Sequence, residues 1–207
     1  MEPLTTLVQS LGVAYAAGIS PYATVALLGV AARQGWIDPL PGALGAVTSP
    51  WIIGLAALLA AVEFTATLVP WVASLWETVH SVVRPPAAAA LAVLTAWGGD
   101  PSLVAAAALL GGSLGLATHA TKLGIRYAID TSPEPVTNGG ANVAELGVVA
   151  SLSYFVWEHP YVSLALALAL LVTLMLLVRL AWRAFRRSMA MMWRPGRRPG
   201  VVTSHDD

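Results

Sequence analysis

Residues 113–146 read SLGLATHATKLGIRYAIDTSPEPVTNGGANVAEL, and this stretch decides the fold. Its first part is apolar enough for a membrane helix, yet it contains a histidine, a lysine and an arginine. Ionisable side chains are rare inside membrane segments and usually have a partner there. A break, Ser132-Pro-Glu-Pro135, separates this part from a second helical part that contains a glutamate. We therefore predict two neighbouring helices that carry polar side chains into a bilayer.

The whole chain has the composition of a membrane protein. Of its 207 residues, 57% are hydrophobic and 11% are charged, and the mean hydropathy is +0.72. Soluble domains usually have about 25% charged residues. Apolar stretches separated by Pro, Gly and Asp indicate an all-α, polytopic helical membrane protein of six to seven spans. The chain has no cysteine, which excludes a disulfide framework and a thiolate metal site.

Basic residues are concentrated near the C-terminus. Seven of the eleven lysines and arginines lie between Arg179 and Arg198. Such residues favour the cytoplasmic side of a membrane and contact anionic headgroups. We therefore expect a single membrane domain over 1–182 and a basic cytoplasmic tail over 183–207 that contacts membrane lipids. Nucleic-acid binding is not expected from an arginine-rich tail that directly follows a final span.

The first two apolar segments are short. They cover Leu4–Ile19 and Pro21–Arg33, whereas a span needs about 20 residues. They are either two tilted spans or a re-entrant pair. An interfacial loop over 34–50 follows, and then Trp51–Val69 is predicted to span the membrane and to contain Glu63.

A different pattern begins at Pro70. Glu77, His80 and Arg84 fall at i, i+3 and i+7 and therefore share one helix face, while valines and leucines line another. This pattern predicts an amphipathic helix in the membrane interface, with these three residues among the headgroups. Pro85-Pro86 is predicted to end it, and a short apolar segment over 87–97 follows.

Three more helices are predicted over 102–129, 142–157 and 161–178. In the first of them, the spacing Gly111-x-x-x-Gly115 predicts close contact with another helix.

Five landmarks recur in the same order in both halves of the chain. They are Ser10-Leu-Gly, Ser20-Pro, Leu28-Gly-Val, Asp38-Pro and Arg84-Pro, and then Ser113-Leu-Gly, Ser132-Pro, Leu146-Gly-Val, His159-Pro and Arg194-Pro. This order predicts two three-helix repeats, over about 4–85 and 102–182, with a linking segment over 86–99. If 87–97 spans the membrane, the repeats are parallel and there are seven spans; if it only dips in, they are inverted and there are six. A cytoplasmic position for both Arg84 and the tail favours the parallel version.

Two polar stripes lie on either side of the proline-rich break. The cationic stripe, at i, i+3 and i+7, consists of His119, Lys122 and Arg126, and the acidic stripe, at i, i+4 and i+7, consists of Asn138, Asn142 and Glu145. A hairpin folded at the break lets the two stripes face each other. Inserting an unpaired charge costs at least about 2.5–3.5 kcal/mol, so we expect the stripes to pair.

Two interpretations of these stripes remain open. In the first, they form a structural ion pair that locks the hairpin. In the second, they form a binding site or polar pathway at the repeat interface, where a broken helix directs its terminus at an anion.

Glu63 has no basic neighbour on its own helix. It is either protonated or paired with a basic residue of another helix, for which His119 is a candidate. A structural pair and a proton relay are its two interpretations. Glu63, Glu77, His80 and His119 are of metal-ligating types, but their spacing matches no metal motif, so neither a metal site nor a cofactor is predicted.

These residues also resemble a family of small bacterial integral membrane proteins catalogued only as a domain of unknown function. The resemblance covers about Leu11–Leu180. Its motifs are Ser49-Pro-Trp51, Val62-Glu-Phe64, Val79-His80, Arg84-Pro85, His119-x-x-Lys122, Gly124-x-Arg126, Ser132-Pro-Glu-Pro135, Thr137-Asn138 and Glu145. Members often have charged residues after the Glu-Phe step, where this chain has Thr65-Ala-Thr67. The resemblance implies a multi-pass protein of the bacterial inner membrane and implies no activity.

Two functions are compatible with this pattern. The first is a small transporter or channel-like protein with its site at the stripes and at Glu63, acting on a small anion or a lipid headgroup. The alternative is a non-catalytic accessory or scaffold protein that binds lipids, a second copy of itself or a partner membrane complex. No nucleophile motif or phosphate loop is present, so no enzyme activity is expected.

Overall fold

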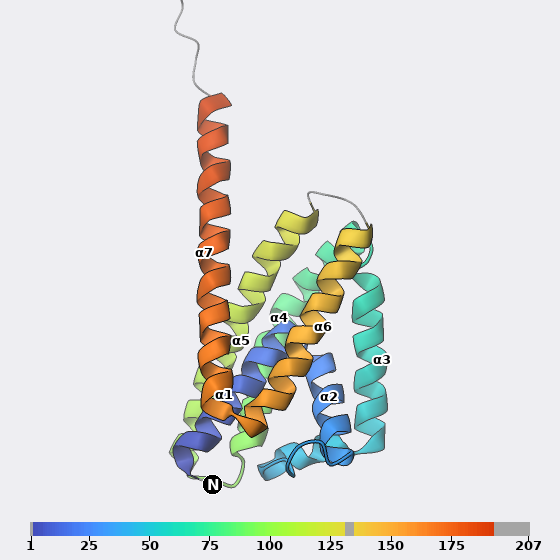
Figure 1. The fold of residues 1–207 in the computed structure, drawn as a ribbon, viewed down its shortest axis with the longest axis vertical. Coiled ribbons are helices and arrows are strands. Elements are labelled where there is room, and N and C mark those ends of the chain that lie inside the picture. The colour runs from blue at the N-terminus through green and yellow to red at the C-terminus, as the bar shows by residue number, and fades with distance from the viewer. Residues whose placement is uncertain (1, 131–134, 193–207) are drawn as a thin grey trace, which may run out of the picture.

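The computed structural model describes residues 2–130 and 135–192, which are helical apart from short connections (Figure 1). The elements are α1 (Pro3–Ile19), α2 (Pro21–Arg33), the short 3-10 helix η1 (Gly42–Thr48), α3 (Pro50–Ala66), α4 (Pro70–Ala96), α5 (Pro101–Asp130), α6 (Pro135–Glu158) and α7 (Pro160–Met192). The expected all-α fold is therefore confirmed for the described residues.

Every α-helix among the described residues begins at a proline. The first N–H groups of a helix have no hydrogen-bond partner within the helix. Proline has no N–H, so at this position it removes no helical hydrogen bond, and the fixed φ of proline already suits a helix. The prolines therefore set most of the predicted helix boundaries. Three predicted boundaries are wrong: α6 begins at Pro135 rather than at 142, α7 continues past 178 to Met192, and α4 does not end at Pro85-Pro86.

α1 and α2 form a broken hairpin that turns inside the bundle. Figure 1 shows α1 rising from the end that holds the N-terminus to about half the bundle height, and α2 returning to the same end. Ser20 makes the break, since its N–H donates to the Ala16 carbonyl and its hydroxyl accepts from the Ala23 N–H. Of the two sequence-based alternatives, this is the geometry of a re-entrant pair.

The remaining helices enclose α1, whose side chains from Val8 to Ile19 are almost all buried. Small residues allow the closest approach. A Cβ added to Gly111 of α5 would lie 2.6 Å from the Cβ of Ala92 in α4, and one added to Gly115 would overlap Ala88. The predicted close helix contact at this glycine pair is confirmed.

Among the described residues, three helical segments are long and apolar enough to cross a membrane, as expected for an integral membrane protein. They are Trp71–Ala96, Pro101–Tyr127 and Pro160–Arg187. A fourth is possible if η1 and α3, which meet at a bend of 75°, form one broken span. The predicted count of six to seven spans is not confirmed, and residues 131–134 and 193–207, which include the Ser-Pro-Glu-Pro break and most of the basic tail, lie outside the described residues.

The prediction that Pro85-Pro86 ends an interfacial helix is wrong. α4 continues through both prolines to Ala96, and membrane helices tolerate such residues because neighbouring groups satisfy the freed carbonyls. The polar face of α4 points into the bundle, since Glu77 and Arg84 are buried, while Val82 is 77% exposed. This helix is therefore apolar outside and polar inside, the reverse of a surface helix in water, because its surroundings are hydrocarbon.

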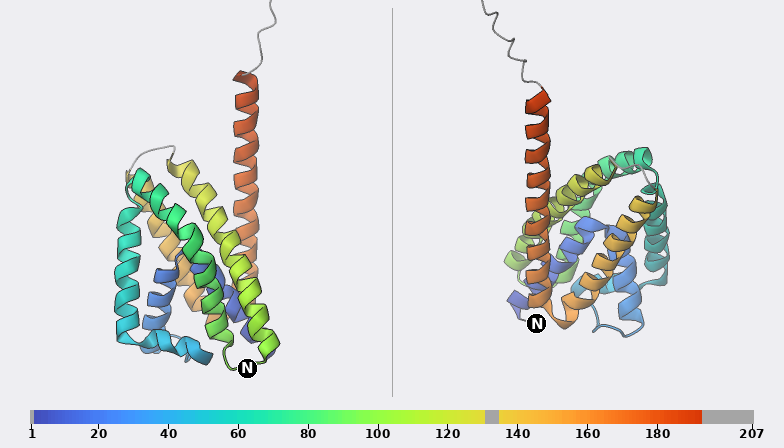
Figure 2. Two further views of the ribbon diagram at one scale, coloured as in Figure 1. Left: turned by 180° about the vertical axis from the view of Figure 1, so that it is seen from behind. Right: turned by 45° about the horizontal axis from the view of Figure 1, so that its top comes forward.

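The predicted internal repeat is not confirmed either. Residues 87–96 belong to α4, so no separate linking segment remains to decide between parallel and inverted repeats. α1 and α2 have 17 and 13 residues, whereas α5 and α6 have 30 and 24. Figure 2 shows a further asymmetry, since α7 continues well beyond the ends of the other helices.

Candidate functional site

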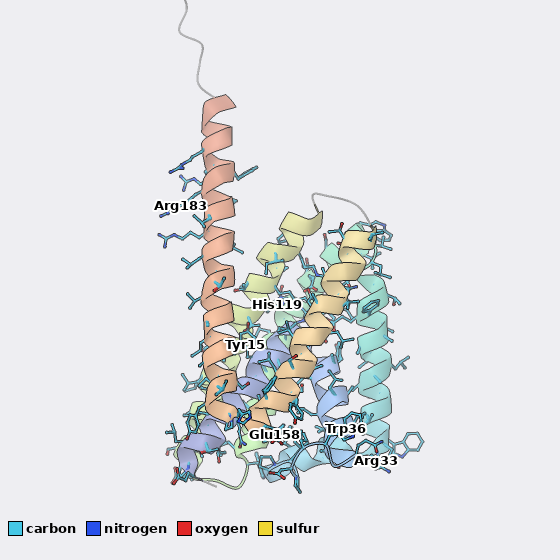
Figure 3. The ribbon with its side chains drawn as sticks, in the orientation of Figure 1. Tyr15, Arg33, Trp36, His119, Glu158 and Arg183 are labelled. Atoms are coloured by element: carbon cyan, nitrogen blue, oxygen red, sulfur yellow. The ribbon has the colours of Figure 1, made fainter. Side chains whose placement is uncertain are left out.

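Six charged side chains form a buried network, which we call the ion network. Its carboxylates are Glu63 of α3, Glu77 of α4 and Glu145 of α6, and its cations are Arg84 of α4 with Lys122 and Arg126 of α5. Three negative charges thus balance three positive ones. The network borders the break between α1 and α2, and Figure 3 shows the adjacent His119 inside the bundle at about half its height.

Arg84 forms the innermost part of the ion network. Its side chain is 0% exposed, and its guanidinium donates to Glu63 at 2.5 Å and to both carboxylate oxygens of Glu77. Such multidentate, charge-assisted hydrogen bonds are among the strongest in proteins. Arg84 therefore ties α3 to α4.

His119 belongs with Arg84 rather than with the acidic stripe. Its Nδ1 lies 2.8 Å from Nη1 of Arg84, and a guanidinium can only donate, so Nδ1 is the acceptor. Nε2 lies 2.9 Å from the Ser81 hydroxyl, which itself donates to the Glu77 carbonyl. Nε2 therefore carries the proton and the ring is neutral, a tautomer inferred from the hydrogen-bond pattern. The prediction that His119 faces the acidic stripe as a cation is wrong.

Lys122 connects three helices. Its Nζ lies 2.9 Å from Oε2 of Glu145 on α6 and donates to the Ile19 carbonyl at 2.9 Å, at the last residue of α1. Glu77 and Glu63 lie farther away, at 3.4 and 3.6 Å. A lysine is favourable at this position because the C-terminal end of a helix carries partial negative charge.

The predicted pairing of the two stripes is confirmed at four residues. Arg126 donates from Nε to Oε1 of Glu145 at 2.9 Å and from Nη2 to Oδ1 of Asn142, while Lys122 holds the other oxygen of Glu145. Asn142 also donates to the Phe64 carbonyl at 2.9 Å, which ties α6 to α3.

Asn138 is not part of this pairing. It is fully buried, and neither polar atom of its side chain has a partner among the described residues. Nη1 of Arg126 is also buried without a partner there. Polar groups buried in this way usually bind water or a ligand.

Glu63 is paired with basic residues of other helices, one of the two predicted alternatives, but the candidate partner is wrong. His119 does not pair with it; Arg84 and Lys122 do, and the Ser20 hydroxyl donates to its Oε2 at 2.5 Å. The error follows from the wrong position assigned to Arg84, because an arginine at the interface would be too far away to pair.

The predicted headgroup-level position of His80 is wrong as well. His80 is buried, stacks on Trp76 and donates from Nδ1 to the Trp76 carbonyl at 2.8 Å. Its Nε2 then accepts from the Tyr22 hydroxyl at 3.1 Å. All three residues expected among the headgroups therefore lie inside the bundle.

Two cavities border the ion network. One, of about 320 Å³, lies among α2, α3 and α6 and is lined by Ser20, Glu63 and Asn142 among others. The other, of about 290 Å³, lies among α1, α5, α6 and α7 and is lined by Lys122 among others. Glu145 lines both cavities, and its side chain is 25% exposed, whereas those of Glu63 and Glu77 are 8% and 2% exposed. Glu145 is thus the most accessible carboxylate of the network.

In the described part of the chain, no group of three or more His, Asp or Glu side chains is placed to hold a metal ion. Lys122 and Arg126 share the Glu145 carboxylate, so the most accessible carboxylate of the network has two cations as partners.

These features define a small, all-helical membrane protein with a charge-balanced ion network in its interior. A family model described as a domain of unknown function, DUF4126, matches residues 7–180. The chain belongs to this family, which confirms the resemblance to an uncharacterised family. No curated protein and no solved structure matches the chain.

Proposed function

We propose that this protein is a small transporter or channel-like protein of the bacterial inner membrane, and that a small anion or a lipid headgroup passes at Lys122, Arg126 and Glu145. The observation that carries the proposal is the position of Glu145. It pairs with both cations and lines both cavities. The proposal assigns no catalytic activity.

The broken helix supports this proposal. In many helical transporters the substrate site lies near the bilayer midplane, where a helix is interrupted and its ends face the substrate. Here the C-terminal end of α1 and the N-terminal end of α2 meet at Ser20. Lys122 and Glu63 contact this break directly.

The division of the ion network into two parts also supports it. Arg84, Glu63 and Glu77 are deeply buried and hold α3 and α4 in place. Glu145 is more exposed, so an incoming anion that displaces it leaves neither Lys122 nor Arg126 unpaired. Such exchange avoids the large cost of a lone buried charge.

The orientation of the protein is part of the same proposal. α7 carries Arg179, Arg183, Arg186 and Arg187, and Figure 3 shows Arg183 pointing away from the other helices. Basic residues at the end of a span favour the cytoplasmic side, so the C-terminus is cytoplasmic.

Flux in proteoliposomes tests the proposal. We would measure methanesulfonate uptake and the transbilayer movement of fluorescently labelled phosphatidylglycerol, for the wild type, Lys122→Met, Glu145→Gln and the double variant. Arg183→Gln is the matched control, because it removes an exposed arginine far from the network. We expect one of the two fluxes to exceed that of protein-free liposomes, and to fall in the Lys122 variant while the control is unaffected. The proposal would be refuted if liposomes with the wild type show no more flux of either probe than liposomes without protein. It would also be refuted if the folded double variant shows the same flux as the wild type.

A scaffold function is the second candidate, and charge balance favours it. Each carboxylate and each cation of the ion network has at least one partner of opposite charge. If the network only locks the fold, Lys122→Met alone should lower the melting temperature more than Lys122→Met with Glu145→Gln, since the single change leaves three buried carboxylates with only two cations and the double change restores the balance. That ranking, combined with the absence of flux, would favour a protein that binds lipids, a second copy or a partner complex.

A further inference from the structure

The cavity among α1, α5, α6 and α7, which we call the lateral cavity, has a mixed lining. Its polar groups belong to Tyr15, Thr118, Thr121, Lys122 and Glu145. The rest of its wall is apolar and consists of Ile19, Ile125, Ala141, Ala144, Val148 and Leu171. An ion pair beside an apolar wall matches a ligand that has a charged head and an apolar chain.

The lateral cavity lies where two helices diverge. Figures 1 and 2 show α6 and α7 close together at the end that holds the N-terminus and separated toward the opposite end. Val148 of α6 and Leu171 of α7 both line the cavity, which places it between these helices. In a bilayer the outer faces of α6 and α7 meet the lipid chains, which places the cavity on a side of the bundle that faces lipid.

Tyr15 supplies a second polar group at this site. It is 1% exposed and lines the cavity, yet its hydroxyl has no hydrogen bond with any residue in the described part of the chain. A buried tyrosine hydroxyl normally has a partner. Here it is a free donor in the same cavity as the Lys122 ammonium, and two such donors are suited to an anion.

We propose that the lateral cavity binds an anionic amphiphile. Its anionic headgroup takes the place of the Glu145 carboxylate at Lys122 and accepts a hydrogen bond from Tyr15, while its chain follows Ile125 and Leu171. The volume of about 290 Å³ is near the lower limit of ligand pockets, about 300–1,000 Å³. It therefore holds the head and the first part of one chain, and the rest of the chain extends between α6 and α7. This assignment rests on the proposed function, because it names the substrate class of the same site.

Two sulfonates that differ only in their chain test the assignment. Decanesulfonate and methanesulfonate have the same head, which stays anionic across the accessible pH range. Binding to the purified full chain in an uncharged maltoside detergent would be measured by titration calorimetry, with empty micelles subtracted. We expect decanesulfonate to bind at least about tenfold more tightly than methanesulfonate, since burial of only a few methylenes is sufficient for this ratio.

Three variants separate this site from a merely structural network. Lys122→Met should abolish binding, whereas Glu145→Gln should strengthen it, because the competing carboxylate is gone. Tyr15→Phe should weaken binding by about fivefold, because one hydrogen bond contributes about 1 kcal/mol. This variant still tests the site if Lys122→Met fails to fold. Tyr154→Phe, at an exposed tyrosine of α6, is its matched control and should bind as the wild type does.

Specific results would overturn the assignment. They are equal affinity for the two sulfonates, unchanged affinity in the Tyr15 variant, or weaker binding in the Glu145 variant. Flux of methanesulfonate without binding of decanesulfonate would refute the amphiphile alone and leave the transport proposal in place. Binding of decanesulfonate without any flux would support the site and refute transport.

Discussion

Replacing Arg84 with methionine is the most direct test of the buried ion network. The guanidinium is completely buried and donates to Glu63, Glu77 and, at 2.8 Å, to His119. Methionine keeps a long, apolar side chain, so the change removes the charge and the hydrogen bonds with little loss of packing. Two buried carboxylates then have only Lys122, at 3.4 and 3.6 Å, as a cation.

The expected cost follows from this geometry. Removing one partner of a buried ion pair usually destabilises a protein by about 3–5 kcal/mol. Because Lys122 still compensates part of the negative charge, we expect a value near the lower limit, about 3 kcal/mol. For a chain of this size each kcal/mol shifts the melting temperature by about 2–4 °C, so the expected decrease is about 6–12 °C.

Thermal unfolding in detergent, followed by tryptophan fluorescence, measures this shift. Arg183→Met is the control, because that arginine is exposed on α7, and its melting temperature should stay within about 2 °C of the wild type, as surface changes usually do. Combining Arg84→Met with Glu77→Gln should restore part of the lost stability, since one uncompensated charge is removed. A single variant that melts like the wild type, or a double variant less stable than the single one, would show that Arg84 does not hold the network together.

Two further predictions concern packing and helix capping. Gly115→Ala should lower the melting temperature because the new Cβ meets α4. Gly54→Ala is the control: a Cβ there meets nothing within 4 Å, so the melting temperature should stay unchanged or rise. Equal changes in melting temperature for the two variants would contradict the described packing of α5 against α4. Asp100 accepts hydrogen bonds from the N–H and hydroxyl of Ser102 at the start of α5, which lower the pKa of its carboxyl. A lowered folded-state pKa stabilises the fold above the unfolded pKa and loses that effect as pH falls through the folded value. The stability difference between the wild type and Asp100→Asn should therefore shrink from pH 7 to pH 3 in unfolding scans, and a constant difference would contradict the assignment.

The sequence was sufficient for the local features of the fold. Prolines at the first helical position mark the helix starts, and i, i+3, i+7 spacing places Lys122 and Arg126 on one face. Their pairing with Glu145 could be predicted because the two stripes flank a single break and buried charges require partners.

What could not be predicted depends on how distant helices pack. The pair of Arg84 and Glu63 joins α4 to α3, and no spacing rule connects such residues. The polar face of α4 has the same pattern as that of a surface helix, and only the neighbouring helices reveal that it points inward. Pro85-Pro86 resembles the prolines that start the other helices, yet it lies inside α4, where membrane surroundings tolerate it.

The broken hairpin has a consequence for how the protein is made. α1 and α2 are synthesised before α5, and with 17 and 13 residues each is shorter than the roughly 20 residues that a span needs. The carbonyl of Ile19 receives its hydrogen bond from Lys122, which is synthesised 103 residues later. The break between α1 and α2 is therefore fully hydrogen-bonded only after α5 has packed against it.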